Sequence, residues 1–534
     1  MSTFKAENTS YQQTGYFSKI VTDYLSQNNV LRDFYQHPPT LRGITDAIAA
    51  RKKFHTNRSL LAEQLEKQYL SVDSGGSVKD NIAALKKENT FTICTAHQPN
   101  IFTGHLYFIY KIIHTIKLAS TLNRDLPGNH FVPVFYVGSE DADLEELGEV
   151  FINGGKHMWE TRQKGAVGRM KVDDALLKML KAIQGELSVE PFGKDIVSMV
   201  QECYVKDRTI QEACFYLVNK LFGEYGLIVL LPDNAELKKQ MLAVFEDDIF
   251  SNIPSAIVNK TSDQLALHYK VQAHPREINI FYLQDNIRNR VVQHKDTYIV
   301  HDTDIKFTKE ELKTELEQYP ERFSPNVILR ALYQEMILPN LAFIGGGGEL
   351  AYWLELQEMF RNYHVPYPVL ILRNSFLLIN EKTDTLIDKL SLTPSDLFKP
   401  EDELVKDIVR KNSSHPLSLQ REKEQMASIY KEIQTSVEEV DGTLVNHVEA
   451  LQVKLLKTLD RLETKLFRAE KRKFEAQQNQ IKKIRSGLFP HGSLQERIEN
   501  FMPFYARWGN EFIKVVYDNS LTFEQEFCTI TEKK

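Results

Sequence analysis

A dense set of polar side chains lies between Thr95 and Tyr107, after a short apolar run and before a helical pattern. It includes two histidines within nine residues. An imidazole can donate a hydrogen bond to negative charge that develops on a phosphate or a carbonyl oxygen, and a glycine lets the backbone approach a ligand closely. A polar helix cap is the alternative interpretation. We expect catalytic roles for His97, Thr103, Gly104 and His105, and substrate-binding roles for Gln98, Asn100 and Tyr107.

An acidic cluster, Ser139 to Asp143, follows a second apolar run. Carboxylates there could hold a substrate amine or hydroxyl, although acidic residues at a helix start also complement the helix dipole without any ligand. The spacing is not specific for a metal, and we expect no metal site. We expect catalytic roles for Glu140 and Asp141 and substrate-binding roles for Ser139 and Asp143.

A run of four glycines follows a third apolar run and precedes a helical pattern. It matches neither the Walker loop nor the dinucleotide fingerprint. Its backbone amides could converge on an anion or on adenosine, with a flexible turn as the alternative. Glutamate and aromatic residues just beyond it suit capping and core packing equally well. The expected cofactor-binding residues are Gly345, Gly346, Gly347, Gly348, Glu349, Tyr352 and Trp353.

A last polar cluster, Arg373, Asn374 and Ser375, follows the apolar run that ends at Leu372. A guanidinium can hold a carboxylate or a phosphate through two hydrogen bonds, whereas an ordinary surface turn is the simpler interpretation. We assign these three residues to substrate binding.

Each of these clusters follows a continuously apolar run, which is typical of a buried parallel strand. Helical patterns separate the runs, so the sequence predicts an α/β fold with a parallel sheet. The carboxyl ends of parallel strands meet at one edge of a sheet, and ligands bind there. We therefore expect the four clusters to form one anion-lined pocket.

The chain also divides by composition. From about 418 to 485 it is rich in Glu, Lys, Gln and Leu, and leucines recur at spacings of three and four from Leu451 onward, which predicts a coiled-coil hairpin that pairs with a second copy. The expected divisions are a helical segment (1–86), core segments (87–150, 216–258 and 323–400), insertions (151–215 and 259–322), the coiled coil (415–487) and a return to the core (488–534).

Charge and composition exclude several classes of protein. The 66 Lys and Arg residues against 72 Asp and Glu residues leave no basic excess that would attract nucleic acid. No window reaches the ~18 apolar residues of a membrane span, and the first residues lack the pattern of a secretion signal. The four cysteines are scattered. We expect a cytoplasmic protein with no nucleic-acid or membrane partner, no disulfides and no cysteine-built zinc site.

Four separated blocks together resemble the family of the bacillithiol biosynthesis cysteine-adding enzyme, BshC. They are Thr95 to Gly104, Ser139 to Asp143, Leu341 to Trp353 and Leu488 to Arg497, with the coiled-coil segment between the last two. The resemblance implies a Rossmann-like core with connecting insertions and a dimerising coiled coil. It also implies a cysteine ligase that joins L-cysteine to the amine of glucosaminyl-malate, which completes bacillithiol. An adenine nucleotide such as ATP is the implied cofactor, with no metal beyond a Mg²⁺ bound to that nucleotide.

This chain departs from the family pattern at two places. Relatives have Gln-Ala-Gly where it has His97 to Asn100, and a histidine where it has Ala142, so a role at either place does not transfer. Gly104 and His105 resemble the second half of the His-x-Gly-His element of class I aminoacyl-tRNA synthetases, with Phe102 in place of the first histidine.

The expected chemistry is amide formation, in which the cysteine carboxylate is activated as an adenylate or an acyl phosphate and the sugar amine then attacks it. The residues around His97 would hold the phosphate or the activated carbonyl, Glu140 and Asp141 would orient the amine, the glycines would face the nucleotide or the sugar, and Arg373 would hold the malate. Two alternatives stay open: a nucleotidyltransferase-type ligase acting on another small acid, and a non-catalytic coiled-coil scaffold that binds metabolites.

Overall fold

The computed structural model describes residues 3–533, which form two compact units. The larger unit contains residues 6–377 and 493–530, and the smaller contains residues 3–5, 378–492 and 531–533. No helix within 3–533 combines the length and the apolar character needed to cross a lipid bilayer.

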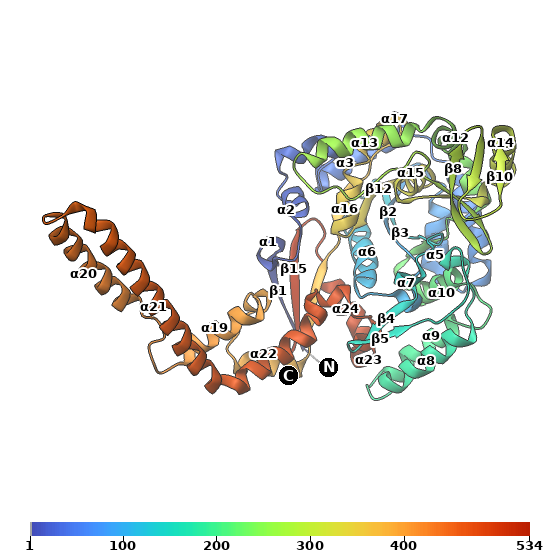
Figure 1. The fold of residues 1–534 in the computed structure, drawn as a ribbon. Coiled ribbons are helices and arrows are strands. Elements are labelled where there is room, and N and C mark those ends of the chain that lie inside the picture. Colours follow the sequence, from blue (N-terminus) through green and yellow to red (C-terminus); the bar gives the residue numbers. More distant parts are fainter. Residues whose placement is uncertain (1–2, 534) are drawn as a thin grey trace. The chain divides into compact units, whose positions relative to one another are not determined.

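A five-stranded parallel sheet forms the centre of the larger unit (Figure 1), with the order β13-β12-β2-β3-β6. Its strands are almost entirely buried, which explains why they read as continuous apolar runs in the sequence. The prediction of an α/β fold with a parallel sheet is confirmed. The strands are β2 (Thr90–His97), β3 (His130–Val137), β6 (Ile228–Leu230), β12 (Asn340–Gly345) and β13 (Val369–Leu372).

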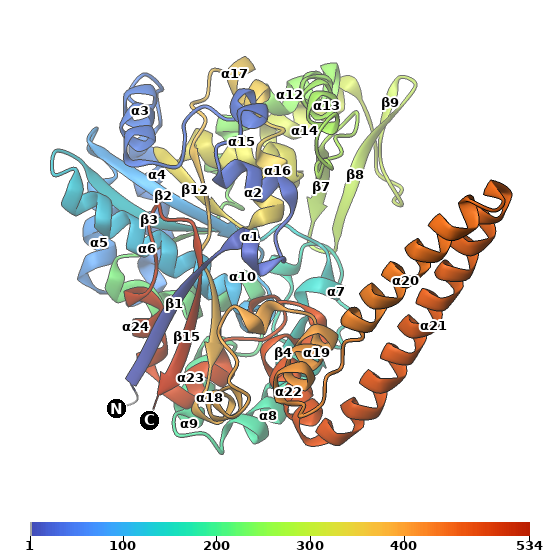
Figure 2. The same ribbon diagram turned by 90° about the vertical axis from the view of Figure 1, so that its left-hand side faces the viewer.

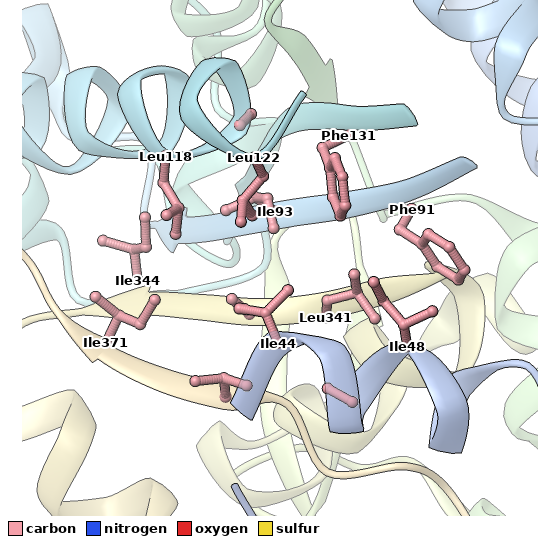
Figure 3. Close-up of a cluster of buried hydrophobic side chains, with 14 residues drawn as sticks. Ile44, Ile48, Phe91, Ile93, Leu118, Leu122, Phe131, Leu341, Ile344 and Ile371 are labelled. Carbon is pink, nitrogen blue, oxygen red and sulfur yellow. The ribbon is translucent and has the colours of Figure 1, made fainter. Parts of the chain in front are cut away.

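Helices close a hydrophobic core over this sheet (Figure 3). Leu118 and Leu122 of α6 (Tyr107–Asp125) belong to the same buried cluster as Ile93 of β2 and Ile44 of α3 (Leu41–Arg51). The apolar residues of α6 recur at helical spacing, so one face of the helix covers the sheet and its first turn is held at the carboxyl end of β2. Other helices of this part of the chain are α1 (Tyr11–Thr14), α2 (Lys19–Leu25), α4 (Arg58–Gln68), α5 (Gly75–Ala84), α15 (Val327–Ile337), α16 (Gly347–Trp353) and α17 (Gln357–Asn362).

Two further groups of elements include the stretches predicted to be insertions. The first contains the antiparallel hairpin β4 (Glu149–Ile152) and β5 (Gly155–Met158), followed by α8 (Asp174–Leu187), α9 (Gly193–Cys203) and α10 (Ile210–Phe222). The second contains an antiparallel sheet of order β10-β9-β8-β7-β11. Its strands are β7 (Ile280–Gln284), β8 (Ile287–His294), β9 (Thr297–Val300), β10 (Lys306–Thr308) and β11 (Phe323–Pro325), and helices α11 (Ala235–Lys238), α12 (Leu242–Ser251), α13 (Ile253–Ala266) and α14 (Lys309–Gln318) accompany it.

The prediction of an entirely helical segment over 1–86 is wrong at its start, because residues Thr3–Ser10 form strand β1. This strand belongs to a three-stranded sheet of order β1-β15-β14, with β14 at Ser375–Ile379 and β15 at Glu526–Lys533. Pairing with the far end of the chain stabilises β1, and local sequence carries no signal of such pairing.

The smaller unit contains the coiled coil. Helices α20 (Gln420–Glu438) and α21 (Val445–Lys471) run side by side and are joined at Asp441 and Gly442 (Figures 1 and 2). Lys423 of α20 forms salt bridges with Asp460 (2.6 Å) and Glu463 of α21. The unit begins at residue 378, inside the stretch 323–400 that was expected to be core, because α18 (Glu381–Lys389) and α19 (Glu401–Asn412) belong to it together with α22 (Glu475–Leu488). Helices α23 (Met502–Trp508) and α24 (Asn510–Asp518) follow in the larger unit.

Candidate active site

A cavity of about 300 Å³ opens at the carboxyl ends of the parallel strands, within the larger unit. Neighbouring strands bring the clusters of the sequence together: Ile344 of β12 pairs in register with Thr95 of β2, and the Gly138 N–H donates to the His97 carbonyl at 2.7 Å. The expectation that the His97 turn and the glycine run face one edge of the sheet is confirmed. The expected site residues that line the cavity are His97, Gln98, Tyr107, Ser139, Glu140, Asp141, Gly346, Gly347, Gly348, Glu349, Tyr352 and Arg373.

Four expected residues of the first cluster shape the turn instead of lining the cavity. Gly104 has a φ of +63°, and a Cβ built there would lie 2.6 Å from the Asn100 Cβ. Thr103 is fully buried, and His105 contacts the Ile498 carbonyl through Nδ1 at 3.1 Å. These residues hold a tight connection between β2 and α6, so the structure gives Asn100, Thr103, Gly104 and His105 a supporting place rather than direct access to a ligand.

The remaining expected residues also lie off the cavity wall. Asp143 caps the short helix α7 (Leu144–Leu147) by accepting from the Glu146 N–H, and Trp353 stacks on Phe343 in the core at 4.6 Å. Gly345 ends strand β12 and accepts from the Arg373 N–H. Asn374 and Ser375 are buried beside Arg373, where Ser375 takes part in a hydrogen-bond network. Capping and packing therefore account for Asp143, Gly345, Trp353, Asn374 and Ser375.

His97 presents a buried imidazole at the cavity wall. Its ring packs against those of Tyr107 at 5.3 Å and Phe108 at 5.5 Å, and its Nε2 has no hydrogen-bond partner within residues 3–533. Burial, together with the positive charge of Lys111, holds the pKa of His97 well below its usual value. The imidazole is therefore neutral at physiological pH, and its free Nε2 can form one hydrogen bond with a ligand.

Two carboxylates, Glu140 and Asp141, also line the cavity. Asp141 accepts from the Gln98 amide at 3.2 Å, and Glu140 forms a buried salt bridge with Lys238 of α11. Burial raises the pKa of Glu140, although the Lys238 ammonium opposes this shift. These two side chains are suited to holding a ligand amine and receiving its proton.

The cavity wall carries four guanidinium groups, of which the sequence indicated only Arg373. Arg330 of α15 donates to the Tyr352 hydroxyl at 2.9 Å, and Arg288 of β8 donates to the Ser324 hydroxyl at 3.2 Å. Neither of these nor Arg497 forms a salt bridge among the described residues, whereas Arg373 pairs with the buried Glu496 at 2.6 Å. The wall therefore has an excess of positive charge that would attract an anionic ligand.

One backbone amide of the glycine turn is already bonded to a residue of the helix that follows, α16. The Glu349 carboxylate accepts from the Gly346 N–H at 2.8 Å and pairs with the buried Lys111 at 2.5 Å. An anion could bind the Gly346 amide only by displacing Glu349. A Cβ built at Gly348 would meet no heavy atom within 4 Å, so the open part of the turn lies there.

Neither a thiolate nor a metal centre is built into the described chain. All four cysteines are buried and unpaired, and burial raises the pKa of the Cys214 thiol to about 12. Within residues 3–533, no group of three or more His, Cys, Asp or Glu side chains is placed to hold a metal ion.

Comparison with known proteins identifies the family. Residues 4–374 match the model for the N-terminal Rossmann-like domain of bacillithiol biosynthesis BshC, and residues 376–532 match the model for its C-terminal coiled-coil domain. This chain belongs to the BshC family. The boundary between the two BshC domains falls next to the point where the chain passes from the larger compact unit to the smaller one.

Full-length relatives carry the BshC name as well. A protein of Flavobacterium johnsoniae named "Putative cysteine ligase BshC" is 39% identical over 98% of this chain and 99% of its own length. Its namesake in Christiangramia forsetii is 37% identical over 98% of both chains, and one in Bacillus cereus is 28% identical over 95% of this chain and 96% of its own. The BshC family thus covers both units of the molecule.

Proposed function

We propose that this chain is a ligase that joins the carboxyl group of L-cysteine to the amine of glucosaminyl-malate, the last step of bacillithiol biosynthesis in the cytoplasm. The observation that carries the proposal is the composition of the cavity wall: carboxylates suited to an amine and unpaired guanidiniums suited to carboxylates line one cavity, in a member of the BshC family.

The charged groups of the wall match the parts of this sugar acid. Malate carries carboxylates, which Arg288 and Arg497 can bind through charge-assisted hydrogen bonds. The sugar amine would then lie against Glu140 and Asp141. The cavity volume is at the lower end of the range for small-molecule sites.

A carboxylate must be activated before an amine can displace its oxygen. We propose that ATP supplies this activation, as an adenylate or as an acyl phosphate. The open backbone at Gly348 and the guanidinium of Arg330 would hold the nucleotide. The neutral His97 imidazole would donate to the oxygen of the activated carbonyl. A Mg²⁺ ion would arrive with the nucleotide, since the described residues offer no metal site of their own.

In the amide-forming step, the sugar nitrogen bonds to the cysteine carbonyl carbon, and the bond from that carbon to the AMP or phosphate oxygen breaks. The nitrogen loses a proton in the same step. We assign the acceptance of this proton to Glu140, and the support for this role is that its carboxylate lines the cavity. The cysteine thiol takes no part in this step and is retained as the thiol group of the product.

The test uses the purified full-length protein with L-cysteine, glucosaminyl-malate and ATP, and mass spectrometry detects the product. The expected product is bacillithiol, with release of either pyrophosphate or phosphate showing which activation operates. Glu140→Gln should abolish product formation, whereas the exposed Glu145→Gln in the same segment should not. If no bacillithiol forms with or without nucleotide, the proposal is rejected.

We further propose that the protein forms a homodimer through the coiled coil. Leucines at coiled-coil spacing remain exposed on α21 after it has paired with α20, with exposed fractions of 43% for Leu451, 46% for Leu462 and 38% for Leu466. A second copy of the same hairpin presents a matching apolar stripe, which would cover these side chains.

A further inference from the structure

The ammonium group of Lys238 is fully buried behind the cavity wall. Lys238 ends helix α11, has no exposed side-chain surface and forms a salt bridge with Glu140. Its Nζ also lies 3.3 Å from an Asp233 carboxylate oxygen and donates to the Glu321 carbonyl oxygen at 3.3 Å. Burying an unpaired charge would be strongly destabilising, so these contacts stabilise the ammonium group in the interior.

A second cation, Arg169, pairs with the Asp233 carboxylate of this cluster. Arg169 donates to both oxygens of Asp233, at 2.6 and 2.8 Å, and to the Glu321 carbonyl oxygen at 3.1 Å. Two cations, Lys238 and Arg169, therefore face two carboxylates, Glu140 and Asp233. Glu140 alone of the four lines the cavity. The network thus connects the proposed proton acceptor with three residues that do not line the cavity.

Opposing effects act on the Glu140 carboxyl. Burial and the neighbouring Asp233 carboxylate favour its protonated form, whereas Lys238 and, more weakly, Arg288 favour its ionised form. The other titratable or charged groups that face it are Arg169, Asp141, and the hydroxyls of Tyr136 and Tyr333. Lys238 is the cation in direct contact with Glu140, so it has the largest favourable effect on the charged form.

We propose that Lys238 is a positioning residue of the ligase reaction. It fixes the Glu140 carboxylate at the cavity wall in the ionised form that accepts the proton lost by the sugar amine. Asp233 shares the same ammonium and so weakens the stabilisation of the Glu140 charge by Lys238. Arg169 pairs with Asp233 and so reduces the repulsion between the Asp233 and Glu140 carboxylates. The proposal rests on the proposed function above, in which Glu140 is the group that receives the proton.

Two substitutions should move the pH dependence in opposite directions. Lys238→Met removes the cation, so the midpoint of the acidic limb of kcat/KM for glucosaminyl-malate should move to higher pH by about one unit or more. Asp233→Asn removes the competing carboxylate, so the midpoint of the same limb should move to lower pH. The ionisation of the substrate amine is titrated separately and is divided out of each profile, so that the remaining limb reports the enzyme. The neighbouring Lys239→Met, whose side chain is 48% exposed and pairs with Glu236, should leave the limb unchanged.

A purely structural role would lower activity or stability at every pH without moving the limb in opposite directions. That result, or a shift of both variants in the same direction, overturns the proposal. If Lys238→Met does not fold, Asp233→Asn alone decides: a limb at lower pH supports the proposal, and an unmoved limb overturns it. Lys238→Arg should restore the wild-type limb in part, because it keeps the charge.

A second readout does not depend on the reaction, so it separates this proposal from the proposed function. In Lys238→Met the folded-state pKa of Glu140 lies further above the unfolded value, so the folded form binds more protons and stability is lost as pH rises through the folded pKa. The melting temperature of Lys238→Met relative to wild type should therefore fall between pH 5 and pH 8. Adding Glu140→Gln should remove this trend. A pH-independent difference would overturn the role of Lys238 even if bacillithiol is formed.

Discussion

The Arg373 guanidinium donates to the Glu496 carboxylate at 2.6 Å, and both side chains are buried. Glu496 also accepts from the Ser375 hydroxyl at 3.1 Å and from the Phe376 N–H at 3.2 Å. This carboxylate therefore fixes the turn after β13 from a segment 123 positions away in the sequence. Arg373, held in this way, lies 5.0 Å from the Tyr107 ring at the cavity wall.

Glu496→Ala should destabilise the larger unit strongly, because it leaves the Arg373 charge buried without a partner. Removal of one member of a buried pair costs about 3–5 kcal/mol of unfolding free energy. Urea unfolding of the full-length protein measures the loss. Glu63→Ala, which breaks an exposed pair with Lys67, should cost less than about 1 kcal/mol. Equal effects of the two substitutions would contradict the structural role of Glu496.

Arg330→Met should weaken ligand binding without a comparable loss of stability, since this guanidinium forms no salt bridge within residues 3–533 and contacts the neutral Tyr352 hydroxyl. A charge-assisted hydrogen bond contributes about 1.5–3 kcal/mol, so kcat/KM should fall by about 10- to 100-fold. Steady-state kinetics with each substrate varied in turn should show that the KM of the nucleotide rises more than that of the sugar acid. The exposed Arg361→Met is the matched control, and an unchanged kcat/KM in Arg330→Met would remove Arg330 from the proposed site.

His114 should make the fold sensitive to acid. Its buried ring donates to the Thr522 carbonyl through Nε2 and accepts from the Asn374 N–H through Nδ1, and burial lowers its pKa to about 4. A folded pKa below the unfolded value near 6.5 means that the unfolded chain binds more protons between these values. The stability contribution is thus complete above pH 6.5 and is lost as pH falls towards 4, by about 3 kcal/mol.

This contribution is measured as the difference in pH dependence between wild type and His114→Gln, from urea unfolding at pH 7, 6 and 5. Other buried histidines contribute to both proteins and cancel in the difference. The substituted protein should lose less stability than wild type on acidification, and the exposed His301→Gln should behave as wild type does. Parallel pH dependence of wild type and His114→Gln would show that His114 is not held in its neutral form.

Substitution of the exposed apolar stripe should dissociate the proposed dimer. Leu462→Glu combined with Leu466→Glu places charge where a second hairpin would pack, so sedimentation should give a dimer for wild type and a monomer for the double variant. Lys465→Glu changes charge on the same helix outside the stripe and should stay dimeric. Circular dichroism checks that the helices persist. Wild type that sediments as a monomer at micromolar concentration would reject the dimer.

The sequence by itself determined the parallel sheet and the edge that carries the cavity. Strands such as 131–137 are buried on both faces and so read as unbroken apolar runs, and the polar residues that follow must lie at a common edge because parallel strands share one direction. His97, Glu140 and the glycine turn were found for this reason. The coiled coil was found because its leucine spacing repeats locally.

Only the tertiary structure decided which residues face the cavity. Arg288 comes from the antiparallel insertion, Arg330 from a helix and Arg497 from the returning segment, and none of them has a local pattern that distinguishes it from a surface arginine. Lys238 meets Glu140 across 98 positions. Contacts of this kind depend on how distant elements pack, whereas sequence periodicity records only which face of one element is buried. The same reason explains why His105 and Trp353, which lie close in the sequence to the cavity-lining Tyr107 and Tyr352, pack into the fold instead.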